Sequence, residues 1–90
     1  MVQVIWTRGA LIELRAIRQY VAEFSPLAAQ RLALRLRSAG EALASSPDRG
    51  RPISRGRREL TIVPPYLIRY LRQGDRLYIL ELRHGARDEA

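Results

Sequence analysis

The stretch RELTIVPPYLIRYLRQGDRLYILELR, residues 58–83, carries the clearest structural signal in this chain. Its apolar and polar side chains alternate with a period of two, which is typical of β-strands. Two adjacent prolines interrupt the alternation because proline cannot donate to a strand ladder, and residues 73–75 (QGD) are typical of a tight turn. The stretch therefore predicts three strands joined as an antiparallel meander, over residues 58–63, 66–72 and 76–83.

The residues before this stretch predict one more strand and two helices. Residues 2–6 (VQVIW) are mostly β-branched and aromatic, and Thr7 after them is a good helix N-cap. Ser25 and Pro26 form a second pair of cap and first-turn residue, so two helices follow each other with almost no loop. Apolar stripes recur at steps of three and four residues, through Ala10, Leu14, Ile17, Val21 and Phe24, and then through Ala29, Leu32, Leu36, Ala39 and Leu43.

These elements predict a single α+β domain over residues 1–90, since a chain of this length seldom divides further. An N-terminal strand comes first, then a helical hairpin, then the three-stranded antiparallel meander, and the strands form one sheet. The short connection between the helices favours an antiparallel pair whose apolar stripes cover one face of that sheet. Residues 48–57 (DRGRPISRGR) show no periodicity and are predicted to be an exposed loop.

The chain is strongly basic, with sixteen Arg, no Lys and nine acidic residues, for a net charge of +7. Such an excess favours an acidic partner, and nucleic acid, an acidic protein and an anionic membrane surface all fit it. Residues 49–58 hold five Arg and no acidic residue, so most of the excess is local. This segment has no aromatic side chain on which bases could stack, so it does not reinforce the nucleic-acid alternative.

Several kinds of site are excluded by residues that the chain lacks. Without Cys there is no disulfide, thiol nucleophile or Cys-based zinc site, and His84 alone cannot supply a two-histidine metal motif. We therefore expect no metal and no other cofactor. No apolar run approaches the roughly eighteen residues of a membrane span, and residues 1–10 do not resemble a signal peptide. A cytoplasmic protein is expected.

Strict alternation along the predicted strands divides their side chains between two faces. One face, which includes Leu60, Ile68 and Leu82, is expected to meet the helices as core. The other carries charged residues together with four apolar side chains, Leu67, Leu71, Leu77 and Ile79. Four such residues on neighbouring strands form a patch for a protein partner to cover, unless the chain's own ends or Arg stems shield it.

Two groups of polar residues offer chemistry. Glu59, Arg69 and Glu81 share the outer face, where the simplest interpretation is a row of ion pairs across adjacent strands. The alternative has Glu59 acting as a base while Arg69 stabilises charge on a phosphate. His84 follows Arg83 at a strand end and is a candidate acid or base, the alternative being a cap for local backbone.

Several short motifs, in order along residues 2–88, resemble the ParE branch of the ParE/RelE toxin superfamily. They are VIWT at residues 4–7, Pro26 with Ala28 and Ala29, LASSP at 43–47, REL at 58–60, PYLIRY at 65–70 and HGARD at 84–88. The resemblance implies the RelE/ParE-like α+β fold, which agrees with the order of elements predicted above. It also implies the toxic component of a type II toxin–antitoxin module, which causes growth arrest.

Members of the ParE branch are associated with inhibition of DNA gyrase and are neutralised by a small ParD-like antitoxin. The C-terminal segment of the antitoxin wraps the toxin, and its N-terminal part dimerises and binds operator DNA. The resemblance therefore implies a hetero-oligomer, a heterotetramer or larger, which reaches operator DNA only through the antitoxin and makes no membrane contact. On this interpretation the chain is not an enzyme.

RelE-like relatives cleave mRNA in the ribosomal A site, and this activity is the alternative. They carry an Arg directly after the aromatic residue of the motif that matches PYLIRY, where this chain has Leu67, and often a Tyr where it has Gly85. Both positions depart from the RNA-cleaving pattern. If the chain is a ribonuclease, the resemblance makes His84 the acid or base and Arg69 and Arg83 the phosphate-stabilising groups. A third alternative is a chain that has lost toxicity.

Two candidate surfaces follow. The target-binding candidates are Arg58, Arg69, Arg83, His84 and Arg87. The antitoxin-binding candidates are the outer-face residues Leu67, Leu71, Leu77 and Ile79, together with Arg49 and Arg51 of the basic segment.

Overall fold

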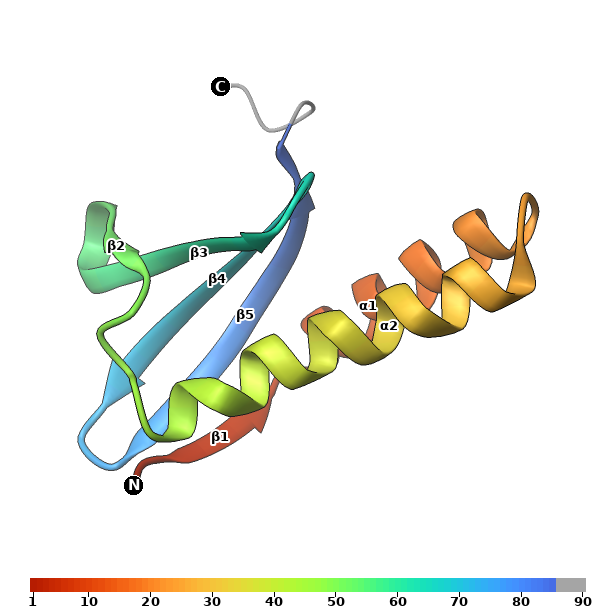
Figure 1. Ribbon diagram of the computed structural model, residues 1–90. Helices are drawn as coiled ribbons and strands as arrows, with labels where there is room; N and C mark the ends of the chain where they lie inside the picture. Colours follow the sequence, from red (N-terminus) through yellow and green to blue (C-terminus); the bar gives the residue numbers. More distant parts are fainter. Residues whose placement is uncertain (86–90) are drawn as a thin grey trace.

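A helical hairpin lies against one face of a five-stranded sheet (Figure 1). The computed structural model describes residues 1–85, apart from the side chain of Ile62. The main elements are β1 (Gln3–Trp6), α1 (Arg8–Ala22), α2 (Pro26–Glu41), β2 (Arg51–Pro52), β3 (Arg57–Val63), β4 (Tyr66–Gln73) and β5 (Arg76–His84). Two single 3₁₀ turns, η1 (Ala42–Ala44) and η2 (Ser54–Gly56), complete the chain.

The predicted fold class is confirmed, with two additions. The sheet has the order β1-β5-β4-β3-β2, in which β3, β4 and β5 form the predicted antiparallel meander and β1 pairs with β5 in parallel. The segment predicted as a loop, residues 48–57, is partly ordered as β2 and η2, because Arg51 and Pro52 pair with Glu59 and Arg58 of β3. The basic segment thus forms one edge of the sheet.

Both helices begin at the predicted caps. The Thr7 hydroxyl accepts a hydrogen bond from the Ala10 amide (3.2 Å) and donates to the Ile79 carbonyl (2.8 Å), so it caps α1 and joins that helix to β5. The Ser25 hydroxyl accepts from the Ala28 amide (3.1 Å) at the start of α2, with Pro26 in the first turn. Because Ser25, the cap of α2, is only three residues beyond the end of α1, the two helices turn back on each other.

The predicted stripe of α2 faces the sheet: Ala29, Leu36 and Leu43 are buried and Leu32 and Ala39 pack against the core. The stripe of α1 is correct through Ala10, Leu14 and Ile17. Phe24 was predicted to continue it, and this is wrong because its side chain is 74% exposed. The hairpin projects beyond the sheet in Figure 1, so its tip has no strand to cover.

Two irregularities in the sheet reverse the predicted alternation. In β5, Tyr70 pairs with Ile79 while Arg69 pairs with Glu81, so Leu80 is an extra residue in the ladder and forms a bulge. Leu77, Ile79 and Leu82 therefore all face the helices, and Leu77 and Ile79 are fully buried. The prediction that Leu77 and Ile79 lie on the outer face is wrong. Tyr78, predicted for the core, pairs with Leu71 and is partly exposed.

The second irregularity lies in β3, between Leu60 and Val63. These two residues are three apart and both buried, which strict alternation does not allow. Glu59, in contrast, keeps its predicted position opposite Arg69. The outer face of the sheet is therefore charged along its centre, with Leu67, Leu71 and Tyr78 partly exposed around it.

Gly40, near the end of α2, lets the helix approach the ring of Trp6 in β1. The Trp6 ring nitrogen donates to the Glu41 carboxylate (2.8 Å), and the Arg37 guanidinium lies 5.2 Å from the centre of the ring. A Cβ atom at Gly40 would lie 2.5 Å from Cζ2 of Trp6, so any larger residue must displace the ring. This contact attaches the N-terminal strand to α2.

Replacing Gly40 by Ala is therefore expected to lower the free energy of unfolding by about 1–2 kcal/mol, despite the better helix propensity of Ala. Urea unfolding followed by Trp6 fluorescence measures this loss. The matched control is Gly9→Ala in α1, where the nearest atom to a new Cβ is the Leu80 carbonyl oxygen at 4.0 Å. That variant is expected to be neutral or more stable, and equal losses in both variants would contradict the packing argument.

Candidate functional site

A network of ion pairs crosses the outer face of the sheet. The Glu59 carboxylate accepts from Arg69 of β4 (2.9 Å) and from Arg51 of β2 (2.7 Å). Glu81 of β5 lies 3.6 Å from Arg57 and 3.5 Å from Arg83, and its distance to Arg69 is 4.0 Å. The predicted row of Glu59, Arg69 and Glu81 is confirmed, and Arg side chains extend it at both ends.

Glu59 is the buried centre of this network, with 6% of its surface exposed. Burial on its own would raise the pKa of Glu59, but the hydrogen bonds and charges of Arg69 and Arg51 outweigh it and hold that pKa below its ordinary value. A carboxylate with a lowered pKa is a weak base at neutral pH. The geometry therefore supports a structural role for Glu59 rather than the alternative of a general base.

The basic segment is neutralised in part by the chain's own groups. Arg51 pairs with Glu59, and Arg57 lies 3.6 Å from Glu81 and donates to Ser54. Arg58, a target-binding candidate, donates to the Gly50 carbonyl (2.7 Å) and lies 3.7 Å from Asp48. Arg49 is exposed. Three of the five arginines at residues 49–58 thus hold this segment in place.

The loop before β2 is closed by a buried tyrosine. The Tyr70 hydroxyl donates to the Pro47 carbonyl and accepts from the Gly50 amide, both at 2.8 Å. Burial raises the pKa of this hydroxyl, although the Gly50 bond and the charge of Arg58 oppose that effect. Arg58 therefore lies on the helix side of the sheet edge with Tyr70, and away from Arg69.

The three residues proposed for RNA cleavage lie on opposite faces. Arg83 pairs with Leu67 of β4 and reaches Glu81 on the outer face. His84 is the next residue, and its ring contacts that of the buried Tyr66 edge to face, with the ring centres 5.4 Å apart. His84 also lines a pocket with Ile17 and Tyr20 of α1. The sheet thus separates His84 from Arg69, whereas Arg83 and His84 both line a small hollow with Glu13 at the end of β5. Arg87 lies outside the described residues.

Large exposed apolar side chains gather on the helical hairpin rather than on the sheet. Apart from Met1, all those of the described residues belong to the hairpin: Leu11, Ile12, Tyr20, Phe24, Leu27 and Leu34. Strand alternation pointed instead to an unpartnered apolar surface on the sheet, so these hairpin residues were not predicted. A sign of them was present, since Leu27 and Leu34 fall seven residues apart and off the stripe that α2 buries.

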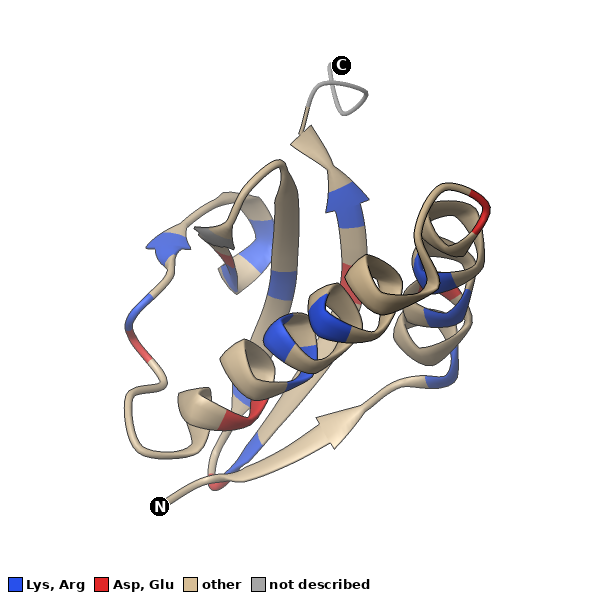
Figure 2. Ribbon diagram, turned by 45° about the vertical axis from the view of Figure 1, so that its right-hand side comes forward, with Lys and Arg blue, Asp and Glu red and all other residues tan. Residues whose placement is uncertain are grey.

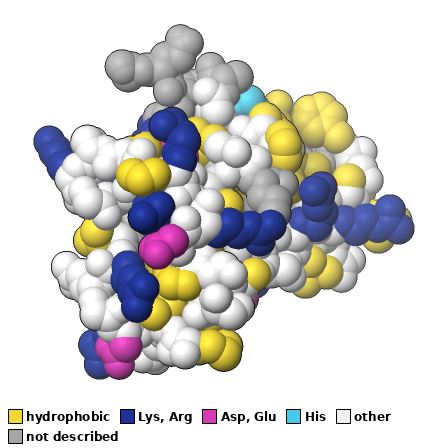
Figure 3. Space-filling view, turned by 60° about the vertical axis from the view of Figure 1, so that its left-hand side comes forward, with side chains coloured by type: hydrophobic (Ala, Val, Ile, Leu, Met, Phe, Trp, Pro, Cys, Tyr) yellow, Lys and Arg dark blue, Asp and Glu magenta, His cyan; other side chains and the backbone are white. Residues whose placement is uncertain are grey.

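Charge is also unevenly distributed. Basic positions occur on both helices as well as on the strands (Figure 2). On the face seen in Figure 3, Arg side chains are spread widely and acidic side chains are few. Within residues 1–85 no group of three or more acidic or histidine side chains could hold a metal ion. No helix in that same part of the chain is long and apolar enough to cross a membrane.

Comparison with known proteins identifies the family. Residues 4–89 match the family described as ParE toxin of type II toxin-antitoxin system, parDE. The chain is 53% identical over 87 residues to Toxin RelE2 of Caulobacter vibrioides, covering 97% of this chain and 99% of that protein. It is also similar to a solved structure titled "Chromosomal ParDE TA system from P. aeruginosa", with a TM-score of 0.81 and 27% identity, over 93% of this chain and 96% of that one. These comparisons confirm the resemblance carried by the sequence motifs, and the chain belongs to the ParE toxin family of type II toxin–antitoxin systems.

Proposed function

We propose that this chain arrests growth by inhibiting DNA gyrase, that it does so without cleaving RNA, and that an antitoxin neutralises it. The observation that supports this choice over RNA cleavage is the position of His84. An acid or base must lie within hydrogen-bond reach of the reacting atoms that the phosphate-stabilising groups hold. Here the sheet stands between His84 and Arg69, so the three residues do not converge on one site, although Arg83 lines a hollow beside His84.

The ion pairs of the outer face support the same conclusion. Arg69 is held by Glu59, and its side chain is 18% exposed. A phosphate bound there would have to compete with a buried carboxylate that keeps its charge well below neutral pH. Arg83 is more accessible, with 42% of its side chain exposed, and among the described target-binding candidates it is the one we propose to meet gyrase.

A supercoiling assay tests the proposal. Purified chain in molar excess is expected to abolish ATP-dependent supercoiling of relaxed plasmid by gyrase, while relaxation of the same plasmid by topoisomerase I continues. Arg83→Glu is expected to weaken inhibition because it reverses an accessible charge at the proposed contact. Arg15→Glu, on the exposed face of α1, is the matched control and is expected to inhibit like the wild type. Normal supercoiling at large excess of the wild-type chain would overturn the proposal.

The RNA-cleaving alternative is tested separately, because one relative is named Toxin RelE2. Primer extension on mRNA after induction of the chain is expected to show no new cleavage within codons. If cleavage did appear, His84→Ala would decide whether His84 takes part. Cleavage that this variant abolishes would contradict the separation of His84 from Arg69 described above.

A further inference from the structure

A cleft lies between α1 and the end of β5, and two adjoining hollows form it. The larger hollow is lined by Ala16, Ile17, Tyr20, Tyr66, Leu82 and His84. The smaller one is lined by Glu13 and Arg83, and it shares Leu82 and His84 with the larger. Because they share these two residues, the hollows are continuous, and we call them together the α1–β5 cleft.

The larger hollow has aromatic side chains both in its wall and beside it. The Tyr66 ring is buried and contacts that of His84 edge to face, with the ring centres 5.4 Å apart. Tyr20 is 53% exposed, and its ring lies edge to face with that of Phe24 (5.5 Å), which is 74% exposed. Exposed aromatic side chains next to a pocket are typical of the places where a protein partner inserts an anchor residue.

The size and charge of the α1–β5 cleft favour a protein partner. The larger hollow has a volume of about 310 Å³, which is near the lower limit of roughly 300 Å³ for small-molecule sites and suits one bulky side chain. Arg83 has 42% of its side chain exposed, and a guanidinium group can donate to a partner's carboxylate. Glu13 accepts from the Leu82 amide (2.9 Å) in the same hollow, and its charge opposes the phosphates of a nucleic acid. The cleft therefore complements a bulky apolar side chain with an acidic one beside it.

We infer that gyrase places a bulky apolar side chain in the larger hollow and a neighbouring carboxylate on Arg83. The inference rests on the proposed function and extends it from one charged contact to the whole cleft. Arg83, the residue proposed above to meet gyrase, lines the smaller hollow, so a single segment of the partner can reach both. An apolar anchor in a pocket with a charged contact beside it is an arrangement in which a few residues supply most of the binding energy.

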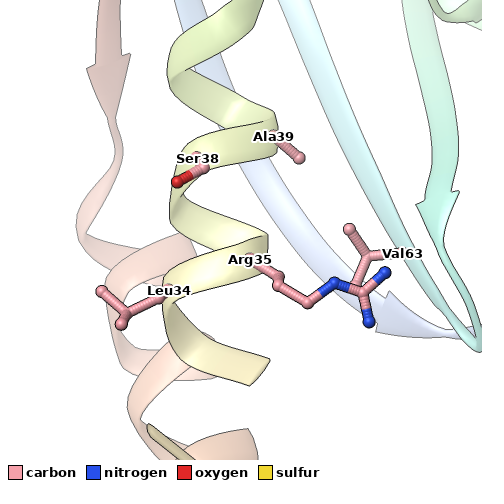
Figure 4. A pocket seen from close by; sticks show the side chains of 5 residues that line it. All are labelled: Leu34, Arg35, Ser38, Ala39 and Val63. Carbon is pink, nitrogen blue, oxygen red and sulfur yellow. The ribbon is translucent and has the colours of Figure 1, made fainter. Parts of the chain in front are cut away.

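A separate hollow on the hairpin provides matched control positions. It lies between α2 and β3, and it shares no lining residue with the α1–β5 cleft. Figure 4 shows the side chains that line it. Leu34 is 61% exposed and matches Tyr20 as an exposed large side chain, while Ser38 matches Ala16 as an exposed small one. The same kinds of substitution in both hollows therefore distinguish an effect of the cleft from a general effect of changing the hairpin.

Inhibition of gyrase supercoiling by cleft variants tests the inference. Tyr20→Ala removes one wall of the larger hollow and Ala16→Trp fills it. Each is expected to raise the concentration for half-maximal inhibition at least about tenfold, as loss of a central contact predicts. The controls Leu34→Ala and Ser38→Trp are expected to change that concentration less than about threefold, as exposed positions outside an interface predict. Circular dichroism checks that each variant is folded, which the exposure of all four positions favours.

Two results of the supercoiling assay would overturn the inference and leave the proposed function intact: cleft variants that inhibit like the wild type, and equal losses in cleft and control variants. Normal supercoiling with excess wild-type chain would overturn both. Calorimetric titration with the product of the adjacent reading frame checks the antitoxin as occupant. Cleft variants that still inhibit but lose this binding would assign the cleft to the antitoxin. A wild-type dimer that the cleft variants dissociate, seen by sedimentation, would assign it to a second copy, and either result would overturn the inference.

Discussion

Replacing Ile79 by Ala is expected to lower the free energy of unfolding by about 2–5 kcal/mol, which is a large part of the total for a small domain. Ile79 is fully buried between the sheet and the helices, and Thr7 at the start of α1 donates to its carbonyl. Truncation would leave a cavity where β1, β5 and α1 meet, because a close-packed core relaxes only in part. Urea denaturation followed by Trp6 fluorescence measures the loss.

Leu80→Ala is the informative control, because strict alternation places Leu80 in the core and Ile79 outside. In the structure Leu80 is the extra residue of the bulge and is partly exposed. Its truncation is therefore expected to cost less than half as much as that of Ile79, since less surface leaves the core. If Leu80→Ala were the more damaging substitution, the register of β5 described here would be wrong.

Glu59→Gln is expected to lower the free energy of unfolding by about 1–3 kcal/mol at neutral pH, as the loss of charged hydrogen bonds at a buried site predicts. Most of this comes from Arg69, whose side chain is 18% exposed; Arg51 contributes less because its side chain is 68% exposed and water screens the pair. Gln has nearly the shape of Glu, so the change removes charge with little change in packing. Chemical denaturation of both proteins measures the difference.

The difference between the two proteins is also expected to depend on pH. Because the pKa of Glu59 is lower in the folded chain than in the unfolded chain, the folded state is stabilised wherever the unfolded carboxyl has already lost its proton. That stabilisation is complete above about pH 5 and is lost as the pH falls below the ordinary Glu value of about 4.3 and through the lower folded value. The two denaturation midpoints should therefore converge in acid. A difference that stays constant from pH 7 to pH 3 would contradict the charged role of Glu59.

The sequence was sufficient to predict the order of elements, both helix caps and the ion-pair row. Thr7 and Ser25 act on amides three residues away, and Glu59, Arg69 and Glu81 stand at neighbouring positions in a simple meander. Each cap depends on local geometry, and the ion-pair row depends on pairing between adjacent strands, whose side chains alternate with a period of two. The family resemblance, which rests on the order of motifs along most of the chain, was also confirmed.

The surface for partners could not be predicted in this way. Residues 76–83 are apolar in both parities, so alternation cannot tell whether Leu77 and Ile79 or Tyr78 and Leu80 face the helices. A one-residue bulge makes that choice. Packing stabilises the bulge, and so do two hydrogen bonds from α1 and its cap: the Thr7 hydroxyl donates to the Ile79 carbonyl, and the Glu13 carboxylate accepts from the Leu82 amide. Such contacts join residues about seventy positions apart. They bury Leu77 and Ile79 of the expected apolar patch, leave the exposed leucines on the hairpin, and place His84 on the opposite face from Arg69. The position of a side chain relative to a sheet depends on the whole assembly of strands and not only on its neighbours in the chain.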